Sequence, residues 1–270
     1  MSSKTNDVRL TDTHCHLQAK AFDEDRETVR DRALESLEWI VVIGDDMESS
    51  QAGLDLTGPG VYAAVGIHPY HAAHVTPEAL GALEGMAGSP HVVALGEMGL
   101  DYFKYNDTPP DVQAEGFRRQ LELAVKLDLP VVIHNRESQD DIISILDDYA
   151  DQLPGGIMHC FSGDIHLVER CVKWGFHVSF AGNVTFPKAG ALREAAAATP
   201  VELLLVETDS PYLAPQPKRG KRCEPAYVRY TAETLAEVKG VSVEELGERT
   251  TANAEQLFRV NNGVVRRNRE

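Results

Sequence analysis

Two histidines near the N-terminus are spaced so that they could bind one cation. His14 and His16 follow the apolar positions Val8 and Leu10, which predict the start of a β-strand. Because strand side chains alternate between two faces, Asp12, His14 and His16 are expected to point the same way. An imidazole pair can chelate a divalent metal, but two nearby histidines are also common as solvated or packed residues. The metal interpretation therefore depends on what the rest of the chain places beside them.

Four further apolar runs end in a residue type that binds metals. These runs cover residues 91–97, 131–134, 156–159 and 203–209, and they end in Glu97, His134, His159 and Asp209. Each residue also has a structural interpretation, because a histidine can be hydrogen-bonded in a core and an aspartate can cap the following helix. Six such residues at strand ends would make the structural interpretation a repeated coincidence.

The elements that would position these side chains alternate between strand and helix. Apolar runs at 39–43, 61–65 and 176–180 bring the strand candidates to eight, and the segments between them carry apolar residues at helical spacing. Continuously apolar strands separated by helices are typical of a parallel sheet covered by helices. Eight such units in 270 residues predict an α/β fold, a closed (β/α)8 TIM barrel.

An open doubly wound sheet is the alternative arrangement of these elements. Its nucleotide-binding version carries Gly-x-Gly-x-x-Gly after the first strand, and no such motif follows here. No linker, low-complexity segment or repeat interrupts the chain, so residues 1–270 are expected to form a single barrel domain.

The composition is that of a globular protein, with 43% hydrophobic and 25% charged residues. Residues 1–7 lack the apolar core of a signal peptide and no later run could span a membrane, which predicts a cytoplasmic protein without membrane association. Cys15, Cys160, Cys171 and Cys223 have no disulfide-type spacing and are expected to be reduced. Strand alternation predicts that Cys15 and Cys160 face the surrounding helices.

The net charge of -16 argues against a surface that coats nucleic acid, because such binding needs many Lys and Arg residues on one face. A phosphate-bearing substrate is still compatible with this charge, since two divalent cations would make the site locally positive.

In a parallel barrel, the C-terminal ends of the strands meet at one mouth, where active sites form. Four imidazoles and two carboxylates are enough for two cations about 3.5–4 Å apart. Glu97 lies midway in strand order and is the expected bridging ligand. We assign His14, His16 and Asp209 to one ion and His134 and His159 to the other.

Several motifs together resemble the TatD family of metal-dependent hydrolases, in the family's order and over nearly the whole chain. They are Thr-Asp-Thr-His-Cys-His at 11–16, Gly-Ile-His-Pro at 66–69, Gly-Glu-Met-Gly-Leu-Asp at 96–101, His-Asn-Arg at 134–136, His-Cys-Phe-Ser-Gly at 159–163 and Glu-Thr-Asp-Ser-Pro at 207–211. The resemblance implies a deoxyribonuclease-type TIM barrel of the wider amidohydrolase group. It implies the metal ligands His14, His16, Glu97, His134, His159 and Asp209. Family members often have Asn in the segment 219–225, where this chain has Cys223.

The expected mechanism uses a metal-activated hydroxide that attacks phosphorus. Asp209 is expected to accept the proton, and Glu207 to orient the water or Asp209, although it could also simply fill the barrel. Arg136 is expected to bind a phosphate oxygen. His68 resembles the family's substrate-facing histidine and is expected to donate to the phosphate.

Two groups at the predicted rim could contact a nucleic acid. Lys218, Arg219, Lys221 and Arg222 form a dense basic cluster, which could bind a phosphate backbone or be a solvated loop. Tyr102, Phe103 and Tyr105 could stack on a terminal base or cover the rim.

The sequence therefore predicts an enzyme that holds two divalent cations (Mg, Mn or Zn) and hydrolyses DNA phosphodiesters, with cleavage from an end as one possibility. An amide, a lactone or another ester is the alternative substrate on the same centre, because the fold does not choose among them. A catalytically silent metal-binding or interaction protein is the alternative of another class. No obligate protein partner is evident.

Overall fold

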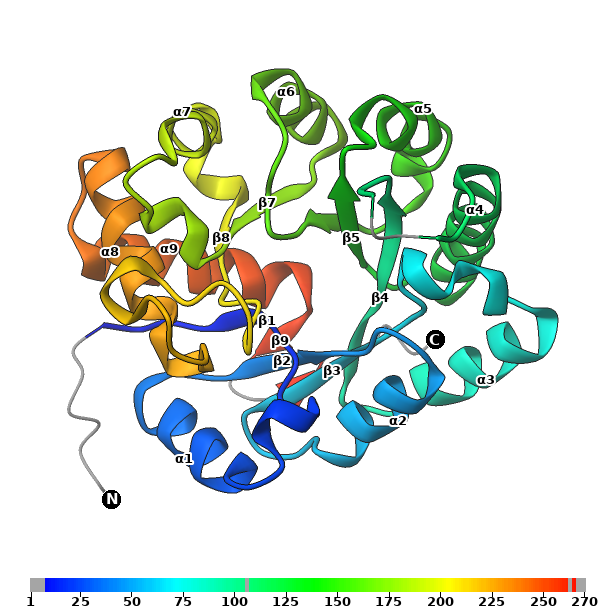
Figure 1. Ribbon diagram of the computed structural model, residues 1–270, viewed down its shortest axis with the longest axis horizontal. Coiled ribbons are helices and arrows are strands. Elements are labelled where there is room, and N and C mark those ends of the chain that lie inside the picture. Colours follow the sequence, from blue (N-terminus) through cyan, green and yellow to red (C-terminus); the bar gives the residue numbers. More distant parts are fainter. Residues whose placement is uncertain (1–7, 105–106, 262–263, 266–270) are drawn as a thin grey trace.

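The computed structural model describes residues 8–104, 107–261 and 264–265. Its main sheet contains eight parallel strands in sequential order, with helices around the outside (Figure 1). The strands are β1 (Asp12–Cys15), β2 (Ile40–Ile43), β3 (Val61–Val65), β4 (Val92–Asp101), β5 (Val131–Arg136), β6 (Gly156–Met158), β7 (His177–Phe180) and β8 (Leu204–Val206). The segment after β8 returns to β1, where Asp209 N–H donates to the His14 carbonyl at 2.9 Å and His16 N–H to the Ser210 carbonyl at 2.7 Å. The strand order and this seam confirm the predicted (β/α)8 TIM barrel.

Local sequence signals mark the ends of several of the helices. They are α1 (Arg26–Ser36), α2 (Met47–Asp55), α3 (Pro77–Ala87), α4 (Pro110–Leu127), α5 (Gln139–Tyr149), α6 (Ile165–Trp174), α7 (Gly190–Ala198), α8 (Val228–Lys239) and α9 (Val243–Leu257). The Thr76 and Asp164 side chains cap α3 and α6 by accepting backbone N–H groups. Gly175 ends α6 at φ 70°, a conformation that favours glycine.

Short 3₁₀ helices and one strand pair complete the described chain. The 3₁₀ helices are η1 (Lys20–Phe22), η2 (Pro69–His74), η3 (Ala150–Gln152), η4 (Gly182–Thr185), η5 (Val201–Leu203), η6 (Gln216–Lys218) and η7 (Pro225–Tyr227). The strands β9 (Val260–Asn261) and β10 (Val264–Val265) pair antiparallel after α9.

The core has two layers because the strand residues alternate. Side chains such as Val42 and Ile133 pack outward against the helices, whereas Ile43 and Val132 belong to the layer inside the barrel. The inner layer also contains Trp39 and Phe258, whose ring centroids lie 6.0 Å apart at the end where β2 begins. Residues that follow α9 therefore close the barrel at the end opposite its mouth.

The inward-facing positions continue directly into the mouth. Ile43 is followed two residues later by Asp45, Val132 by His134, Ile157 by His159, and Leu205 by Glu207 and then Asp209. The alternation that builds the apolar interior therefore also aims these polar side chains at one place.

Strand β4 is longer than the sequence predicted, since it continues past Glu97 to Asp101. Its extension pairs with β5, where Gly99 lies opposite His134. Gly99 has φ 138°, and a Cβ atom there would lie 2.1 Å from the His134 carbonyl oxygen. Glycine therefore permits the close approach that carries β4 alongside β5.

Among the described residues, no helix combines the length and the apolar character needed to cross a lipid bilayer.

Candidate metal centre

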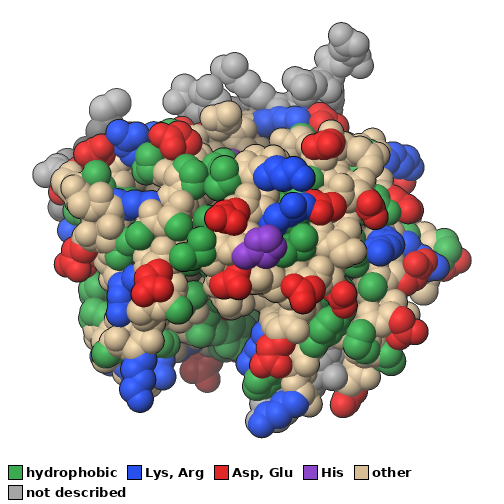
Figure 2. Space-filling view, turned by 90° about the horizontal axis from the view of Figure 1, so that it is seen from above, with side chains coloured by type: hydrophobic (Ala, Val, Ile, Leu, Met, Phe, Trp, Pro, Cys, Tyr) green, Lys and Arg blue, Asp and Glu red, His purple; other side chains and the backbone are tan. Residues whose placement is uncertain are grey.

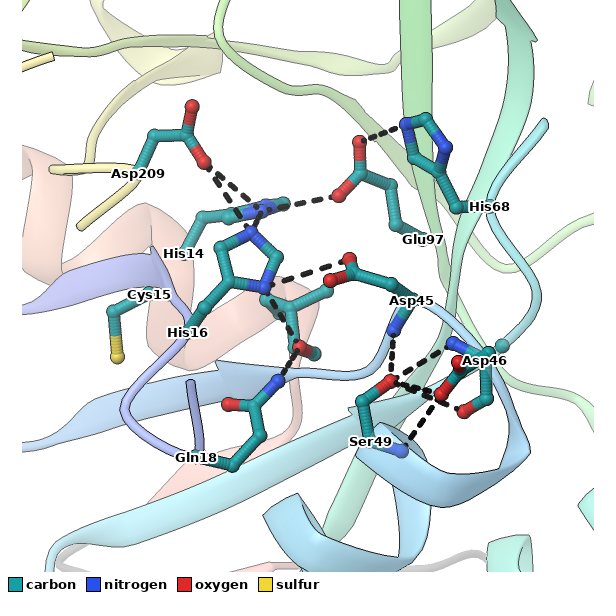
Figure 3. Close-up of polar contacts among 12 residues, drawn as sticks. His14, Cys15, His16, Gln18, Asp45, Asp46, Ser49, His68, Glu97 and Asp209 are labelled. Atoms are coloured by element: carbon teal, nitrogen blue, oxygen red, sulfur yellow. Dashed lines mark hydrogen bonds and ion pairs between the residues drawn. The ribbon is translucent and has the colours of Figure 1, made fainter. Parts of the chain in front are cut away.

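The buried carboxylate of Glu97 lies between two groups of histidines. Its Oε2 is 3.3 Å from His14 Nε2, and its Oε1 is 2.7 Å from both His134 Nδ1 and His159 Nε2. The two oxygens of one side chain thus face the two sets of ligands that the sequence assigned to separate ions. Figure 3 shows Glu97 directed towards His14 on one side and His68 on the other.

The first set contains His14, His16 and Asp209. The two Nε2 atoms of His14 and His16 lie 3.2 Å apart, and Asp209 Oδ1 is 3.3 Å from His16 Nε2 and 3.7 Å from His14 Nε2 (Figure 3). One ligand atom from each residue lies within 4.8 Å of the other two. Strand β1 and the turn after β8 supply these atoms, which is why they meet at the barrel seam.

The second set contains His134 and His159, which share Glu97 with the first. His134 Nδ1 and His159 Nε2 lie 3.4 Å apart, and the rings of His159 and His14 stack at a centroid distance of 4.0 Å. The structure therefore brings the other five expected ligands around the Glu97 carboxylate.

Three of the histidines are held from behind through the ring nitrogen that faces away from the centre. His16 Nδ1 lies 3.0 Å from the Ile43 carbonyl, His134 Nε2 lies 2.9 Å from Asp101 Oδ2, and His159 Nδ1 lies 3.3 Å from Glu207 Oε1. Because each of these acceptors takes an N–H, the other ring nitrogen would present its lone pair to the centre once a cation displaces its proton. Lone pairs facing a carboxylate are favourable only with positive charge among them, so this donor set fits cations.

Asp101 and Glu207 are themselves held in place. Asp101 Oδ1 accepts the Phe103 N–H at 2.9 Å, and Gln113 brackets the Asp101 backbone by accepting its N–H and donating to its carbonyl. Glu207 Oε1 accepts the Cys160 N–H at 2.8 Å. The sequence associated Glu207 with Asp209 or the water, but its observed contacts are with His159 and Cys160.

The electrostatics of the centre also suit a cation. Burial alone would lower the pKa of His16, but the carboxylates of Asp45, Asp209 and Glu97 raise it to about 10. Burial likewise opposes ionisation of Glu97, yet His159 and the other imidazoles hold its pKa well below the usual value. Glu97 and Asp209 are therefore ionised, and they attract positive charge to the space between the rings.

His68 and Arg136, the two expected substrate-binding residues, both line the mouth. His68 Nδ1 accepts the Tyr70 N–H at 3.1 Å, which places the ring proton on Nε2, 3.5 Å from Glu97 Oε1. Burial lowers the pKa of His68 to about 3, so the ring is neutral and offers an N–H donor. The Arg136 guanidinium lies 3.7 Å from the Phe103 ring centroid, and this stacking holds it at the rim.

Asp45 and the role of Asp101 were not predicted from the sequence. Asp45 lines the mouth, and its Oδ1 is 3.5 Å from His16 Nδ1 (Figure 3). Its position two residues beyond inward-facing Ile43 was the signal that could have identified it. Asp101 could not be identified in this way, because its contact with His134 depends on the extension of β4.

One expected orientation was wrong. Cys15 is buried outside the centre as predicted, with Sγ 3.3 Å from the Val41 carbonyl, but Cys160 lines the mouth. Strand β6 ends at Met158 and Cys160 has φ 40°, so strand alternation no longer applies at this residue.

The basic cluster after β8 is largely paired within the protein. Arg222 makes two hydrogen bonds to the Asp25 carboxylate, Arg219 lies 4.2 Å from the Phe186 ring centroid, and Lys218 lies 5.0 Å from that of Tyr227. Lys221, the fourth member of the cluster, is exposed. On the side shown in Figure 2, basic and acidic side chains are interspersed.

The three aromatic residues expected to stack on a base or cover the rim do not act as one group. The Tyr102 hydroxyl donates to Asp141 at 2.6 Å, and Phe103 supports Arg136. Tyr105 lies outside the described residues.

The mouth contains a cavity of about 640 Å³, a size typical of pockets that bury a small ligand. It is lined by ligand residues, by His68 and Arg136, and by Tyr70 and Tyr212. The cation-binding groups therefore open to a space that can hold a substrate.

Comparison with known proteins agrees with this arrangement. A family model described as TatD related DNase matches residues 11–259. An uncharacterized metal-dependent hydrolase, YabD of Bacillus subtilis strain 168, is 44% identical over 93% of this chain and 100% of its own. A protein named 3'-5' ssDNA/RNA exonuclease TatD, from Erwinia billingiae, is 36% identical over 93% of this chain and 99% of its own.

The fold comparison gives the same family. The crystal structure of YJJV, a TatD homolog from Escherichia coli K12, superposes with a TM-score of 0.87 at 30% identity and covers 95% of this chain and 100% of its own. The resemblance noted from the motifs is thereby confirmed. The chain belongs to the TatD family of metal-dependent hydrolases.

Proposed function

We propose that this chain binds two divalent cations at the mouth of its barrel and hydrolyses the phosphodiester bonds of a DNA strand, removing nucleotides from an end. His14, His16 and Asp209 would hold one cation, and His134 and His159 would hold the other. Glu97 would contribute its carboxylate to both sites.

The observation that carries this proposal is the position of Glu97. Its two carboxylate oxygens face different sets of imidazole nitrogens, at 3.3 Å on one side and 2.7 Å on the other. A carboxylate shared in this way is the usual bridge of two-metal hydrolytic sites, which act on phosphoesters among other substrates.

The cations, when bound, supply positive charge at the phosphoryl oxygens and lower the pKa of water towards neutrality. Protein side chains carry out the other steps. Asp209 accepts the proton of the attacking water, because burial, which raises its pKa, is outweighed by His16 and His14, which keep the carboxylate ionised. Glu207 and Asp101 are positioning residues, since they fix the protons of His159 and His134 on the side away from the substrate.

Substrate binding is assigned to Arg136 and His68. The Arg136 guanidinium, held flat on Phe103, offers its N–H fork to a non-bridging phosphate oxygen. Neutral His68 offers its Nε2–H to the same group without adding charge. The exonuclease name of the Erwinia billingiae relative supports a nucleic-acid strand as the substrate.

The test is hydrolysis of single-stranded DNA labelled at either end, with Mg²⁺, Mn²⁺ or Zn²⁺ added to chelator-treated protein. A panel of aryl esters, amides and lactones is assayed in parallel. We expect stepwise shortening of the oligonucleotide only with a metal present, and its loss in Glu97→Ala and Asp209→Asn. An exposed matched variant, Asp141→Asn, should retain it.

Two results would contradict the proposal. If the oligonucleotide stays intact while an amide or lactone is cleaved rapidly with metal present, DNA is not the substrate and the alternative substrate class is correct. Undiminished cleavage by Glu97→Ala would show that the bridging assignment is wrong.

A further inference from the structure

Tyr212 is the most exposed large hydrophobic side chain among the described residues, at 60%. It nevertheless lines the cavity that contains the metal ligands. Its ring centroid lies 6.1 Å from that of His16, with the planes at 65°. An aromatic ring that is both exposed and adjacent to a catalytic centre is placed to contact substrate.

The backbone that carries the Tyr212 ring is fixed relative to the metal ligands. Tyr212 N–H donates to the Asp209 carbonyl at 2.9 Å, so both side chains belong to one turn. The next residue, Leu213, packs so closely on the η4 segment that a Cβ atom at Gly182 would lie 2.2 Å from the Leu213 carbonyl oxygen. The turn is therefore anchored at Asp209 and at Gly182, and Tyr212 keeps its distance from the centre.

The other aromatic rings at the mouth already have roles. The Tyr70 hydroxyl bonds to Asp101 and Arg136, and the Phe103 ring lies under the guanidinium of Arg136. Tyr70 and Phe103 thus belong to the phosphate-binding side of the cavity. Tyr212 lies on the side of His16 and Asp209.

The negative charge of the chain is a second reason to expect a base to stack on Tyr212. The chain carries a net charge of -16, so a polyanionic strand gains little attraction from the protein as a whole. Of the basic cluster after β8, Arg222 is already paired with Asp25, and Arg219 and Lys218 lie over aromatic rings. Contacts to bases would therefore add to the affinity that Arg136 and the cations supply at the phosphate, and every base has a face that can stack on an aromatic ring.

We propose that Tyr212 is a stacking platform for one unpaired base, that of the nucleotide beside the phosphodiester being hydrolysed. This inference rests on the nuclease function proposed above. A base inside a duplex is paired and covered by its neighbours, so it can reach Tyr212 only after unpairing and unstacking. The site therefore selects single-stranded ends, whatever their sequence.

The test is a double-mutant cycle between the ring and the base. The dissociation constant of a fluorescein-labelled oligothymidylate is measured by anisotropy in EDTA, for the parent and Tyr212→Ala. Each measurement is repeated with strands whose 3' or 5' terminal nucleotide is abasic. Stacking of one base predicts that removing either partner weakens binding about 10-fold, and that removing both weakens it no further.

Tyr212→Trp should retain the affinity, because it keeps an aromatic face. Val172→Ala, which truncates an exposed apolar side chain on α6, should bind both strands like the parent. A parent that shortens single strands and duplexes at equal rates would also contradict the selection of unpaired ends.

Different results would contradict the stacking role of Tyr212 and the nuclease function. If the parent shortens DNA but Tyr212→Ala distinguishes base from abasic ends as the parent does, the stacking platform is wrong and the nuclease function stands. If the parent shortens no strand under any metal condition, the nuclease function is wrong, and the platform falls with it.

Discussion

Replacing Asp101 with asparagine tests whether the proton of His134 is fixed from behind. In the native protein, Asp101 Oδ1 accepts the Phe103 N–H and Oδ2 accepts the His134 Nε2–H, each at 2.9 Å. Asparagine has one acceptor oxygen in place of two, so one of these N–H groups must face an NH₂ group. If the oxygen stays on Phe103, the NH₂ group favours the His134 tautomer protonated on Nδ1, the nitrogen that faces Glu97.

The free-energy cost of Asp101→Asn can be estimated from the burial of the Asp101 side chain. Asp101 is only 1% exposed, so water cannot satisfy the misplaced group. A buried donor without an acceptor costs about 1–3 kcal/mol. Since about 1.4 kcal/mol corresponds to a tenfold change in a binding constant, the cation at His134 and His159 should bind about 10–100-fold more weakly. The cation at His14, His16 and Asp209 should be affected much less.

The assay is titration of metal-free protein with Mn²⁺ against a competing chelator, which resolves a tight and a weakened step. Nitrogen NMR shifts of the histidine rings report which His134 nitrogen is protonated. Asp141→Asn is the matched control, because Asp141 bonds to the Tyr102 hydroxyl away from the centre. Two undiminished binding steps, with His134 still protonated on Nε2, would refute the reasoning.

Three further predictions concern the scaffold and the cations. Gly99→Ala places a Cβ atom 2.1 Å from the His134 carbonyl oxygen, at a residue whose φ is 138°. This substitution should displace β5, weaken Mn²⁺ binding and lower the unfolding temperature. Unchanged Mn²⁺ binding in the titration described above would contradict this prediction. His177, at the start of β7, has its pKa lowered to about 4 by burial, so the unfolded state takes up its proton first as the pH falls. Relative to His177→Gln, the parent should therefore lose up to about 3 kcal/mol of unfolding free energy between pH 6.5 and 4, and none above pH 6.5. Urea titrations at each pH measure this free energy, and the same pH dependence in both proteins would contradict the prediction. Removing bound cations with a chelator should abolish hydrolysis and lower the unfolding temperature, with recovery of both on adding Mn²⁺, because a ligand bound only by the folded state stabilises it.

The barrel could be predicted from the sequence because each strand is a short apolar run with a fixed alternation. The same alternation placed His134, His159 and Asp209 at the mouth, since each lies an even number of residues beyond an inward-facing position. It would also have placed Asp45 there. These features depend only on local periodicity, which a single sequence contains.

The supporting contacts could not be predicted in this way. The bond from His134 to Asp101 requires β4 to continue beside β5, which in turn requires the close backbone approach at Gly99. The pairing of Arg222 with Asp25 joins a loop after β8 to the segment before α1, and nothing in the order of the residues indicates it. Such contacts depend on tertiary packing between distant segments, and they decide which charged groups remain available to a substrate.

The packing of Trp39 against Phe258 has a consequence for biosynthesis. The first of these residues leaves the ribosome more than two hundred residues before the second, yet both seal the same end of the barrel. The earlier strands must wait for α9 with their apolar interior open to water. A nascent chain of this protein should accordingly bind holdase chaperones until Phe258 has been synthesised, and shortening the chain just before Phe258 should yield an aggregation-prone product.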